Sequence, residues 1–203
     1  MPIKLIKSNP TIWEVGVGDE FTSKSHPFWY DERNTVVLFE PNPFLYASLV
    51  RKAGSYKNVR LYNVAISNEN RFGYLVSAGL LSYLPEFFSP INTIFRGKLT
   101  LMLDAFKVPI NIMTFDRFDN GNIDMLILGM EGAEFTVFET MSSRPSIIVL
   151  NNHYANDYGY TLPRAEVIQN WCRDNQYQIV QGIPDIMLLN QASLMNGLIS
   201  IEQ

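Results

Sequence analysis

The last two predicted strands of the chain are joined by only five residues, and this feature limits the fold most strongly. Residues 177–180 and 186–189 are short runs rich in apolar side chains, as strands are. A connection as short as 181–185 permits only antiparallel pairing, because parallel neighbours need a crossover of about a dozen residues or more. The chain is therefore expected to end in an antiparallel hairpin.

The segments before this hairpin alternate between strands and helices. Helical spacing of apolar residues predicts a helix that begins at Pro43 and two more over 131–141 and 162–175. The strand-like runs are 11–15, 35–39, 58–64, 71–76, 110–115, 123–128 and 146–150. Such alternation is typical of an α/β fold, in which helices cover a mostly parallel sheet. The expected fold is thus a parallel sheet completed by one antiparallel strand.

Length and composition indicate one domain over residues 1–203. The chain has 47% apolar residues and 18% charged residues, which is enough apolar surface for a core. The segment from about 77 to 109 has scattered aromatic residues and internal prolines, and it fits neither period. We expect it to be an insertion or lid of that domain.

Charge, cysteine and hydropathy exclude several classes of protein. The net charge of −4 provides no cationic excess for nucleic acid or an anionic membrane surface. Cys172 is the only cysteine and there are two histidines, so we expect no disulfide framework and no metal site. No apolar stretch is long enough for a signal peptide or a membrane span, which favours a cytoplasmic protein.

The first candidate site is the glycine-containing turn after the strand at 11–15. Gly16 and Gly18 let the backbone approach a ligand closely, and Glu14 offers hydrogen-bond acceptors to a cationic group. Glu20 stands where a dinucleotide motif has its third glycine, so a pyrophosphate is disfavoured. An ordinary turn after a strand is the alternative interpretation.

The second candidate site follows the next strand. Glu40 comes about 20 positions after the glycines, where an acidic residue commonly accepts hydrogen bonds from ribose hydroxyls. Asn42 and Pro43 then have the order of a helix N-cap and first helical residue. An exposed glutamate at the end of a strand is the alternative.

These motifs, taken together and in order, resemble those of the FkbM-type methyltransferases, a branch of the class I S-adenosylmethionine-dependent enzymes. The resemblance covers about residues 12 to 189. The motifs are Glu14-Val15-Gly16-Val17-Gly18, Phe39-Glu40-Pro41-Asn42-Pro43, Asn63-Val64-Ala65-Ile66-Ser67, Thr114-Phe115-Asp116, Ile123-Asp124 and Glu131-Gly132-Ala133-Glu134.

The resemblance implies a Rossmann-like fold with a seven-stranded mixed sheet, helices on both faces, and S-adenosylmethionine as the cofactor. It also implies methylation of a hydroxyl group on a sugar, a polyketide or a similar small metabolite. The residues implied to bind the cofactor are Glu14, Gly16 and Gly18 in the donor loop, Glu40 at the ribose, the adjoining Asn42, and Ala65 near the adenine.

Two further residues are candidates for catalysis. Glu131 is expected at the carboxyl edge of the sheet, facing the methyl donor, although acidic residues also favour a helix start for electrostatic reasons. His153 follows the strand at 146–150, and an imidazole there can take the proton of a substrate hydroxyl. A loop histidine with local hydrogen bonds is the alternative.

The chain also departs from the family pattern. The family's Leu-Lys-Ile-Asp-x-Glu-Gly is here Leu126-Ile127-Leu128-Gly129-Met130-Glu131-Gly132, so a lysine and an aspartate are replaced, and Asn151 and Asn152 stand where the family tends to have a glutamate. A catalytically inactive protein that acts as a binding or scaffold partner is therefore the second hypothesis. A nicotinamide-dependent oxidoreductase is the third, and Glu20 and the final hairpin oppose it.

The sequence does not identify the residues that cover the bound acceptor. Few residues precede the donor loop, so a cover must come from about 77–109, from the loop after His153, or from a partner subunit. The last option makes a homo-oligomer one of the expected arrangements.

Overall fold

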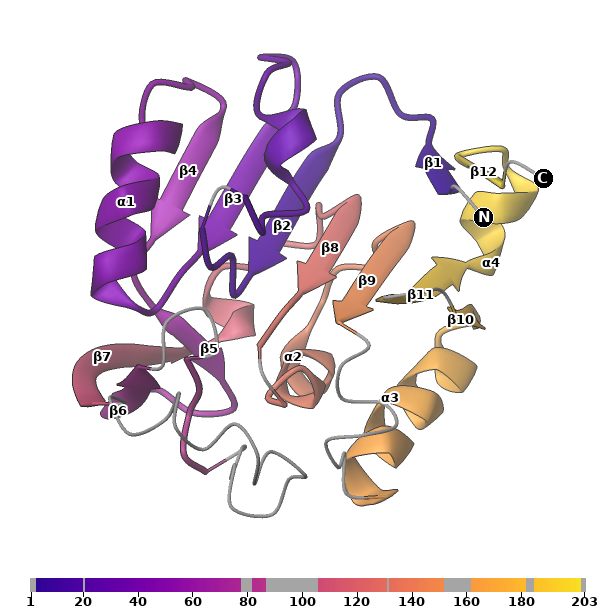
Figure 1. Ribbon diagram of the computed structural model, residues 1–203. Helices are drawn as coiled ribbons and strands as arrows, with labels where there is room; N and C mark the ends of the chain where they lie inside the picture. Colours follow the sequence, from indigo (N-terminus) through magenta and orange to yellow (C-terminus); the bar gives the residue numbers. More distant parts are fainter. Residues whose placement is uncertain are drawn as a thin grey trace.

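The computed structural model describes residues 3–19, 21–77, 82–86, 106–130, 132–151, 162–181 and 185–201. Its centre is a seven-stranded sheet (Figure 1). In spatial order the strands are β10 (Tyr177–Gln181), β11 (Asp185–Asn190), β9 (Ile147–Asn151), β8 (Met125–Leu128), β2 (Thr11–Val15), β3 (Thr35–Phe39) and β4 (Val59–Tyr62).

The end of the chain forms the antiparallel hairpin that the short connection predicts. β10 pairs with β11 in a register that joins Tyr177 to Asn190, and β11 runs antiparallel to β9 as well. The pairs among β9, β8, β2, β3 and β4 are all parallel. The prediction of a parallel α/β sheet completed by one antiparallel strand, of the Rossmann-like kind, is confirmed.

Helices cover both faces of this sheet. α1 (Pro43–Ala53) packs Leu49 and Ala53 on the face that carries Val36 and Leu38. α4 (Gln191–Met195) and the 3₁₀ turn η1 (His26–Phe28) contact the same face through Leu194 and Phe28. α2 (Phe135–Thr140), α3 (Leu162–Asp174) and the 3₁₀ turn η6 (Phe115–Arg117) cover the other face.

α1 begins where the sequence predicts. The Asn42 side chain accepts a hydrogen bond from the backbone N–H of Phe44 at 3.0 Å, and Pro43 is the first helical residue. α2 is shorter than the expected 131–141 and starts only at Phe135. Here the buried Glu134 carboxylate accepts hydrogen bonds from the N–H groups of Met130 and Gly132, which stabilises a turn in place of a first helical turn.

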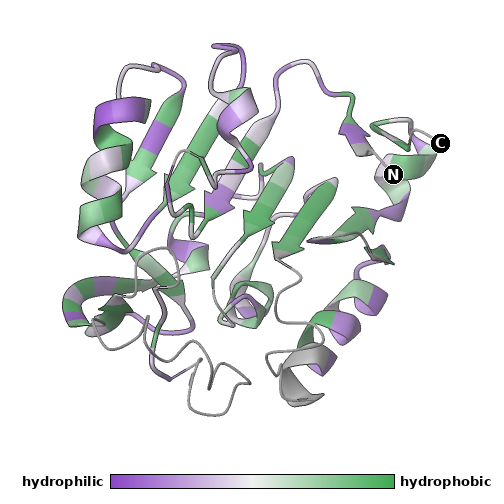
Figure 2. Ribbon diagram, in the orientation of Figure 1, coloured by the Kyte–Doolittle hydropathy of each residue, from purple (hydrophilic) through white to green (hydrophobic). Residues whose placement is uncertain are grey.

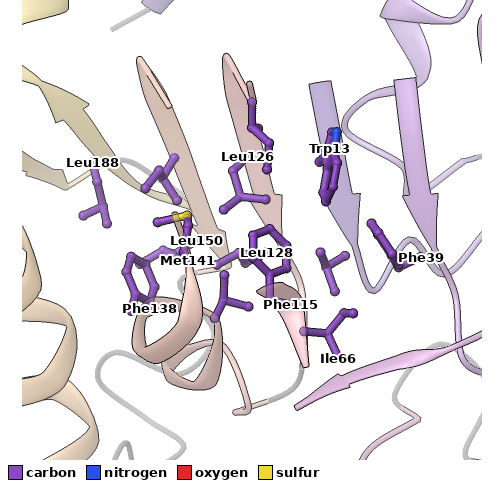
Figure 3. Packing of buried hydrophobic residues seen from close by; sticks show 14 of the residues in the cluster. Trp13, Phe39, Ile66, Phe115, Leu126, Leu128, Phe138, Met141, Leu150 and Leu188 are labelled. Atoms are coloured by element: carbon purple, nitrogen blue, oxygen red, sulfur yellow. The ribbon is translucent and has the colours of Figure 1, made fainter. Parts of the chain in front are cut away.

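The largest core cluster lies between the sheet and the helices α2 and α3. Figure 2 shows that the central strands β8 and β9 are almost entirely hydrophobic, in keeping with burial on both faces. Trp13 and Phe39 meet Phe115 of η6 and the neighbouring strand residues in this cluster (Figure 3). The Trp13 ring lies 5.5 Å from the centroids of both phenylalanines.

Two smaller sheets complete the fold. β1 (Ile3–Leu5) pairs with β12 (Ile199–Ile201), which brings the two ends of the chain together (Figure 1). β5 (Ala65–Ser67), β7 (Phe106–Thr114) and β6 (Arg71–Ser77) form a three-stranded sheet. Figure 1 shows that sheet beyond the arrowheads of β2, β3 and β4, at the end of the main sheet where their carboxyl termini lie.

The expected lid at about 77–109 needs correction at both ends. β6 extends through Ser77 and β7 begins at Phe106, so these ends are paired strand. The pairing joins Val76 to Lys107 and Ser77 to Phe106, which the irregular composition did not predict. Residues 82–86 are also described, and Tyr83 forms a bridge with Val76. The rest of the expected lid lies outside the described residues.

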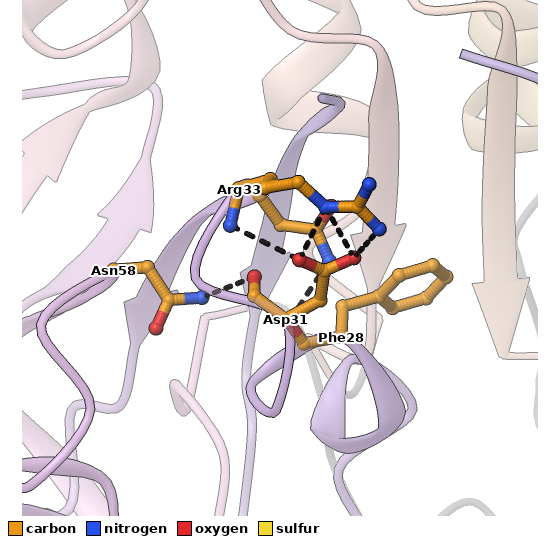
Figure 4. A network of polar contacts seen from close by, with 5 residues as sticks. Phe28, Asp31, Arg33 and Asn58 are labelled. Atoms are coloured by element: carbon orange, nitrogen blue, oxygen red, sulfur yellow. Dashed lines mark hydrogen bonds and ion pairs between the residues drawn. The ribbon is translucent and has the colours of Figure 1, made fainter. Parts of the chain in front are cut away.

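A polar network fixes the loop before β3 (Figure 4). Arg33 forms an ion pair with Asp31, and their contact lowers the Asp31 pKa to about 2. The Asn58 side-chain amide donates to the Asp31 carbonyl at 3.1 Å, and the Asn34 amide donates to the Phe28 carbonyl at 3.0 Å. These bonds connect η1 to the starts of β3 and β4.

Within the part of the chain that the structure describes, no helix is long and apolar enough to cross a membrane.

Candidate functional site

A pocket opens where the order of the parallel strands reverses. β2 lies between β3 and β8, and the carboxyl ends of these strands form the edge at which α/β sheets bind ligands. The pocket encloses about 540 Å³ of empty space, part of which is open to solvent. It is lined by Val15, Gly16, Gly18, Glu40, Pro41, Leu45, Val64, Ala65, Ile66, Leu75, Ser82, Tyr83, Leu84, Gly129, Met130 and Ala133.

The glycine turn brings two backbones into direct contact at the floor of this pocket. Gly16 has φ +78°, and a Cβ atom added to it would lie 2.1 Å from the carbonyl oxygen of Gly129. Gly18 has φ +73°, which is also a left-handed conformation that favours glycine. A side chain at position 16 would therefore collide with the end of β8.

Glu40 directly follows β3 and holds the glycine turn. One carboxylate oxygen accepts a hydrogen bond from the Gly18 N–H and the other from the Asn42 N–H, each at 2.8 Å. The side chain is almost fully buried, and this burial raises the Glu40 pKa to about 7, with a smaller contribution from the charge of Glu14. The pocket thus contains a carboxylate that changes charge near neutral pH.

Asn42 connects the start of α1 to the cover of the pocket. Its side-chain amide donates to the hydroxyls of Ser77 and Ser82 at 3.0 and 3.1 Å, while its oxygen caps the helix. Ser82 and the next two residues line the pocket. The sequence predicts the cap, but the contact of Asn42 with residue 82 depends on tertiary structure and has no signal in the sequence.

Glu14 occupies a different place from the other candidate residues. Its buried carboxylate accepts hydrogen bonds from the Ser23 hydroxyl, the Lys24 N–H, and both the N–H and the hydroxyl of Ser25, at 2.6–3.1 Å. Burial raises the Glu14 pKa, and these hydrogen bonds oppose that shift. The carboxylate therefore orders residues 23–25, and Glu14 is not among the residues that line the pocket.

The remaining wall of the pocket is apolar. Ala65, on β5, lines it together with Val64, Leu45 and Leu75. Tyr83 and Leu84 contribute from the short segment that pairs with β6. Tyr83 is nearly buried and contributes its aromatic ring to the pocket at the glycine turn.

The structure brings Gly16, Gly18, Glu40 and Ala65 together around one pocket, and Asn42 lies directly behind Glu40. His153 and Glu131, the candidates for catalysis, lie outside the described residues. Among the described residues, no group of three or more His, Cys, Asp or Glu side chains is arranged to hold a metal ion.

Comparison with known proteins identifies one family. Residues 14–179 match the family model described as the methyltransferase FkbM domain. No curated protein matches the chain.

Several solved structures resemble the chain at low identity. Precorrin-6y C5,15-methyltransferase from Geobacter metallireducens is 13% identical, with 91% of this chain and 80% of that chain covered and a TM-score of 0.43. Aeropyrum pernix fibrillarin, solved with natively bound S-adenosyl-L-methionine, is 11% identical, with coverages of 91% and 67% and a TM-score of 0.49. A SAM-dependent methyltransferase from Aquifex aeolicus is 11% identical, with coverages of 90% and 82% and a TM-score of 0.45.

Proposed function

Because this chain belongs to the FkbM methyltransferase family, we propose that it binds S-adenosylmethionine in the pocket at the glycine turn and methylates a hydroxyl group of a small metabolite. The observation that carries the proposal is the position of Glu40. Glu40 directly follows β3 beside the point where strand order reverses, lines the pocket, and accepts a hydrogen bond from the glycine turn.

The residues around the pocket fit the parts of this cofactor. The Glu40 carboxylate is an acceptor suited to the two ribose hydroxyls. Ala65, Leu75 and Leu84 offer an apolar wall suited to the adenine ring. Gly16 and Gly18 line the pocket with backbone alone, which suits the remaining part of the cofactor. Among the described residues that line the pocket there is no lysine or arginine, which disfavours a phosphate-bearing dinucleotide.

The chemistry requires a base and a fixed approach of the acceptor. When bound, S-adenosylmethionine supplies a methyl carbon to the acceptor oxygen as the sulfonium–carbon bond breaks, and S-adenosylhomocysteine is released. Positioning of the oxygen in line with that bond provides much of the acceleration. We assign the removal of the hydroxyl proton to His153, and to Glu131 a place beside the methyl donor. The acceptor class is a hydroxylated sugar, a polyketide or a similar metabolite.

The test is calorimetric titration of the purified protein with S-adenosylmethionine and S-adenosylhomocysteine, with NAD as the negative control. We expect micromolar binding of the two sulfur nucleotides and none of NAD. Glu40→Ala should weaken the binding of both sulfur nucleotides by tenfold or more, because the ribose loses its acceptor. The variant should remain folded. Absence of binding by folded wild-type protein would contradict the proposal.

Turnover is tested separately with radiolabelled methyl donor and a panel of hydroxylated sugars and polyketides. His153→Ala should abolish most of the turnover and leave donor affinity unchanged. Full activity of that variant would assign the base elsewhere. Donor binding without turnover on any acceptor would favour the second candidate, an inactive scaffold, which the neutral residues Ile127 and Gly129 support.

A further inference from the structure

A second pocket lies at the opposite end of the same strands. It encloses about 610 Å³, including space open to solvent. Thr11 and Thr35, which line it, are the first residues of β2 and β3 and face each other in register. The pocket at the glycine turn is at the last residues of these strands, about 15 Å away for strands of five residues. We call this second cavity the amino-edge pocket.

The amino-edge pocket carries positive charge that the described residues do not neutralise. Arg60 of β4 and Arg117 of η6 line it, both are exposed, and neither forms an ion pair within the described part of the chain. Its lining, as far as the structure describes the chain, includes no acidic residue.

Two acidic groups on neighbouring segments, Asp119 and Asp124, are occupied by other partners. The Asp119 carboxylate accepts hydrogen bonds from the N–H groups of Gly121, Ser142 and Ser143 and from the Ser143 hydroxyl. Asp124, which accepts from the Thr11 N–H, forms an ion pair with Lys7 at 2.8 Å. The two arginines are therefore available to an anion from solution.

The indole of Trp13, which lines the same cavity, carries a buried donor without a partner in the described part of the chain. Trp13 is 5% exposed and lines the amino-edge pocket, and its Nε1–H has no hydrogen-bond partner among the described residues. Figure 3 shows this nitrogen on the side of the ring toward the amino-terminal ends of the strands. A buried donor without a partner costs about 1–3 kcal/mol, which an acceptor in the pocket would recover.

Aromatic rings form one wall of the cavity beside these donors. Tyr62 stacks on Phe39 with 5.2 Å between ring centroids, and Phe118 lies 5.1 Å from Tyr62. Tyr62 and Phe118 both line the pocket, and the Tyr62 side chain is 37% exposed. This wall suits a flat apolar group next to the anion.

We propose that the amino-edge pocket is a second ligand site, which binds a small aromatic oxyanion. Its phosphate or carboxylate group would pair with Arg60 and Arg117 and accept the Trp13 Nε1–H bond, and its ring would lie against Tyr62 and Phe118. Guanidinium forks match both oxyanions, so the shared chemistry is that of a negatively charged group with two or three acceptor oxygens.

The test is titration with phenyl phosphate, benzoate and inorganic phosphate, with phenol as the uncharged control. Binding is followed by calorimetry and by the indole N–H resonances in ¹H–¹⁵N NMR. The chain has three tryptophans, and Trp13→Phe identifies the resonance of Trp13. We expect one aromatic anion to bind and to move that resonance downfield, and phenol to do neither. The tighter of the two anions identifies the oxyanion that the site prefers.

Variants separate a built site from general charge attraction. Arg60→Gln and Arg117→Gln should each weaken binding about tenfold or more, because each removes a charge-assisted contact. Arg173→Gln is the matched control, since Arg173 is exposed on α3 and outside the pocket, and it should leave the affinity unchanged. Saturating S-adenosylhomocysteine should also leave it unchanged.

Three results would overturn the proposal. They are no binding of any anion by folded protein, equal affinity in both arginine variants and the wild type, and displacement of the anion by S-adenosylhomocysteine. The last result would assign the anion to the pocket at the glycine turn.

Discussion

The carboxylate of Glu40 accepts a hydrogen bond from the Gly18 N–H at 2.8 Å, although the two residues are 22 positions apart in the sequence. The second oxygen of the same carboxylate accepts from the Asn42 N–H. Glu40 therefore joins the turn after β2, the end of β3 and the start of α1. The proposed ligand-binding residue is also the residue that orders its own pocket.

This arrangement predicts a pH dependence of stability. The Glu40 pKa is raised to about 7 in the folded protein, from 4.5 in the unfolded chain, so the folded state binds the proton more tightly. The free energy of unfolding should therefore fall as the pH rises from about 4.5 to 7, and Glu40 should contribute about 3 kcal/mol to this fall. In Glu40→Gln, urea unfolding between pH 5 and 8 should lack that part of the decline. An identical pH profile in the two proteins would contradict the buried, titrating carboxylate.

Ligand affinity should depend on pH in the opposite direction. Ionised Glu40 has more acceptor capacity for ribose hydroxyls than the protonated form. Wild-type protein should bind S-adenosylhomocysteine several times more tightly at pH 8 than at pH 6, and Glu40→Gln should show little change. Calorimetry at both values measures this. Asp31→Asn is the control, because Asp31 belongs to the surface network in the loop before β3.

Gly16→Ala should destabilise the protein strongly. The added Cβ would lie 2.1 Å from the Gly129 carbonyl oxygen, and the residue would also keep φ +78°. Gly121 has φ +83° with no atom within 4 Å of an added Cβ, so Gly121→Ala reports the cost of the backbone conformation alone. That cost is about 1–2 kcal/mol. Urea unfolding should give a loss for Gly16→Ala that is clearly larger, and equal losses would show that the two backbones separate freely.

Asn42 should have two separable roles. Asn42→Ala removes the cap of α1 and the links to Ser77 and Ser82, so we expect a loss of about 1–2 kcal/mol and weaker donor binding. Asn42→Asp keeps the capping oxygen and removes the amide donor, so stability should change less while affinity still falls. Asn190→Ala removes a comparable cap from α4, far from the pocket, and should lower stability alone. If Asn42→Asp binds the donor as the wild type does, the links to residues 77 and 82 are unimportant for binding.

Glu14 should be important for stability. In Glu14→Ala the buried N–H groups of Lys24 and Ser25 lose their acceptor, and we expect a loss of about 3 kcal/mol or more. Glu14→Gln should also be destabilising, because its amide group would face one of these N–H donors. Glu32→Ala, at an exposed position in the same region, should stay within about 0.5 kcal/mol of the wild type. Thermal unfolding of the three variants measures the difference.

Patterns that span a few residues were sufficient to predict much of this protein. Apolar runs identify β2, β3, β8 and β9, and the short connection determines the antiparallel hairpin of β10 and β11. The Asn42–Pro43 pair predicts the start of α1, and the order of the motifs identifies the family. These features are local, because strand periodicity, helix capping and turn length act within one segment of chain.

Other features were decided only by tertiary structure. Three contacts join separate segments of the sequence. The Glu14 carboxylate points toward residues 23–25, Gly16 contacts Gly129, and Ser82 lines the pocket. The amino-edge pocket likewise depends on the register of β2, β3 and β4, which brings Thr11, Thr35 and Arg60 to one face. The sequence by itself determined the strands β2, β3, β8 and β9, the final hairpin and the start of α1, and where the glycine turn and Glu40 follow β2 and β3. Packing decided what each side chain meets, because a buried polar group takes whichever partner the assembled chain brings within hydrogen-bonding distance.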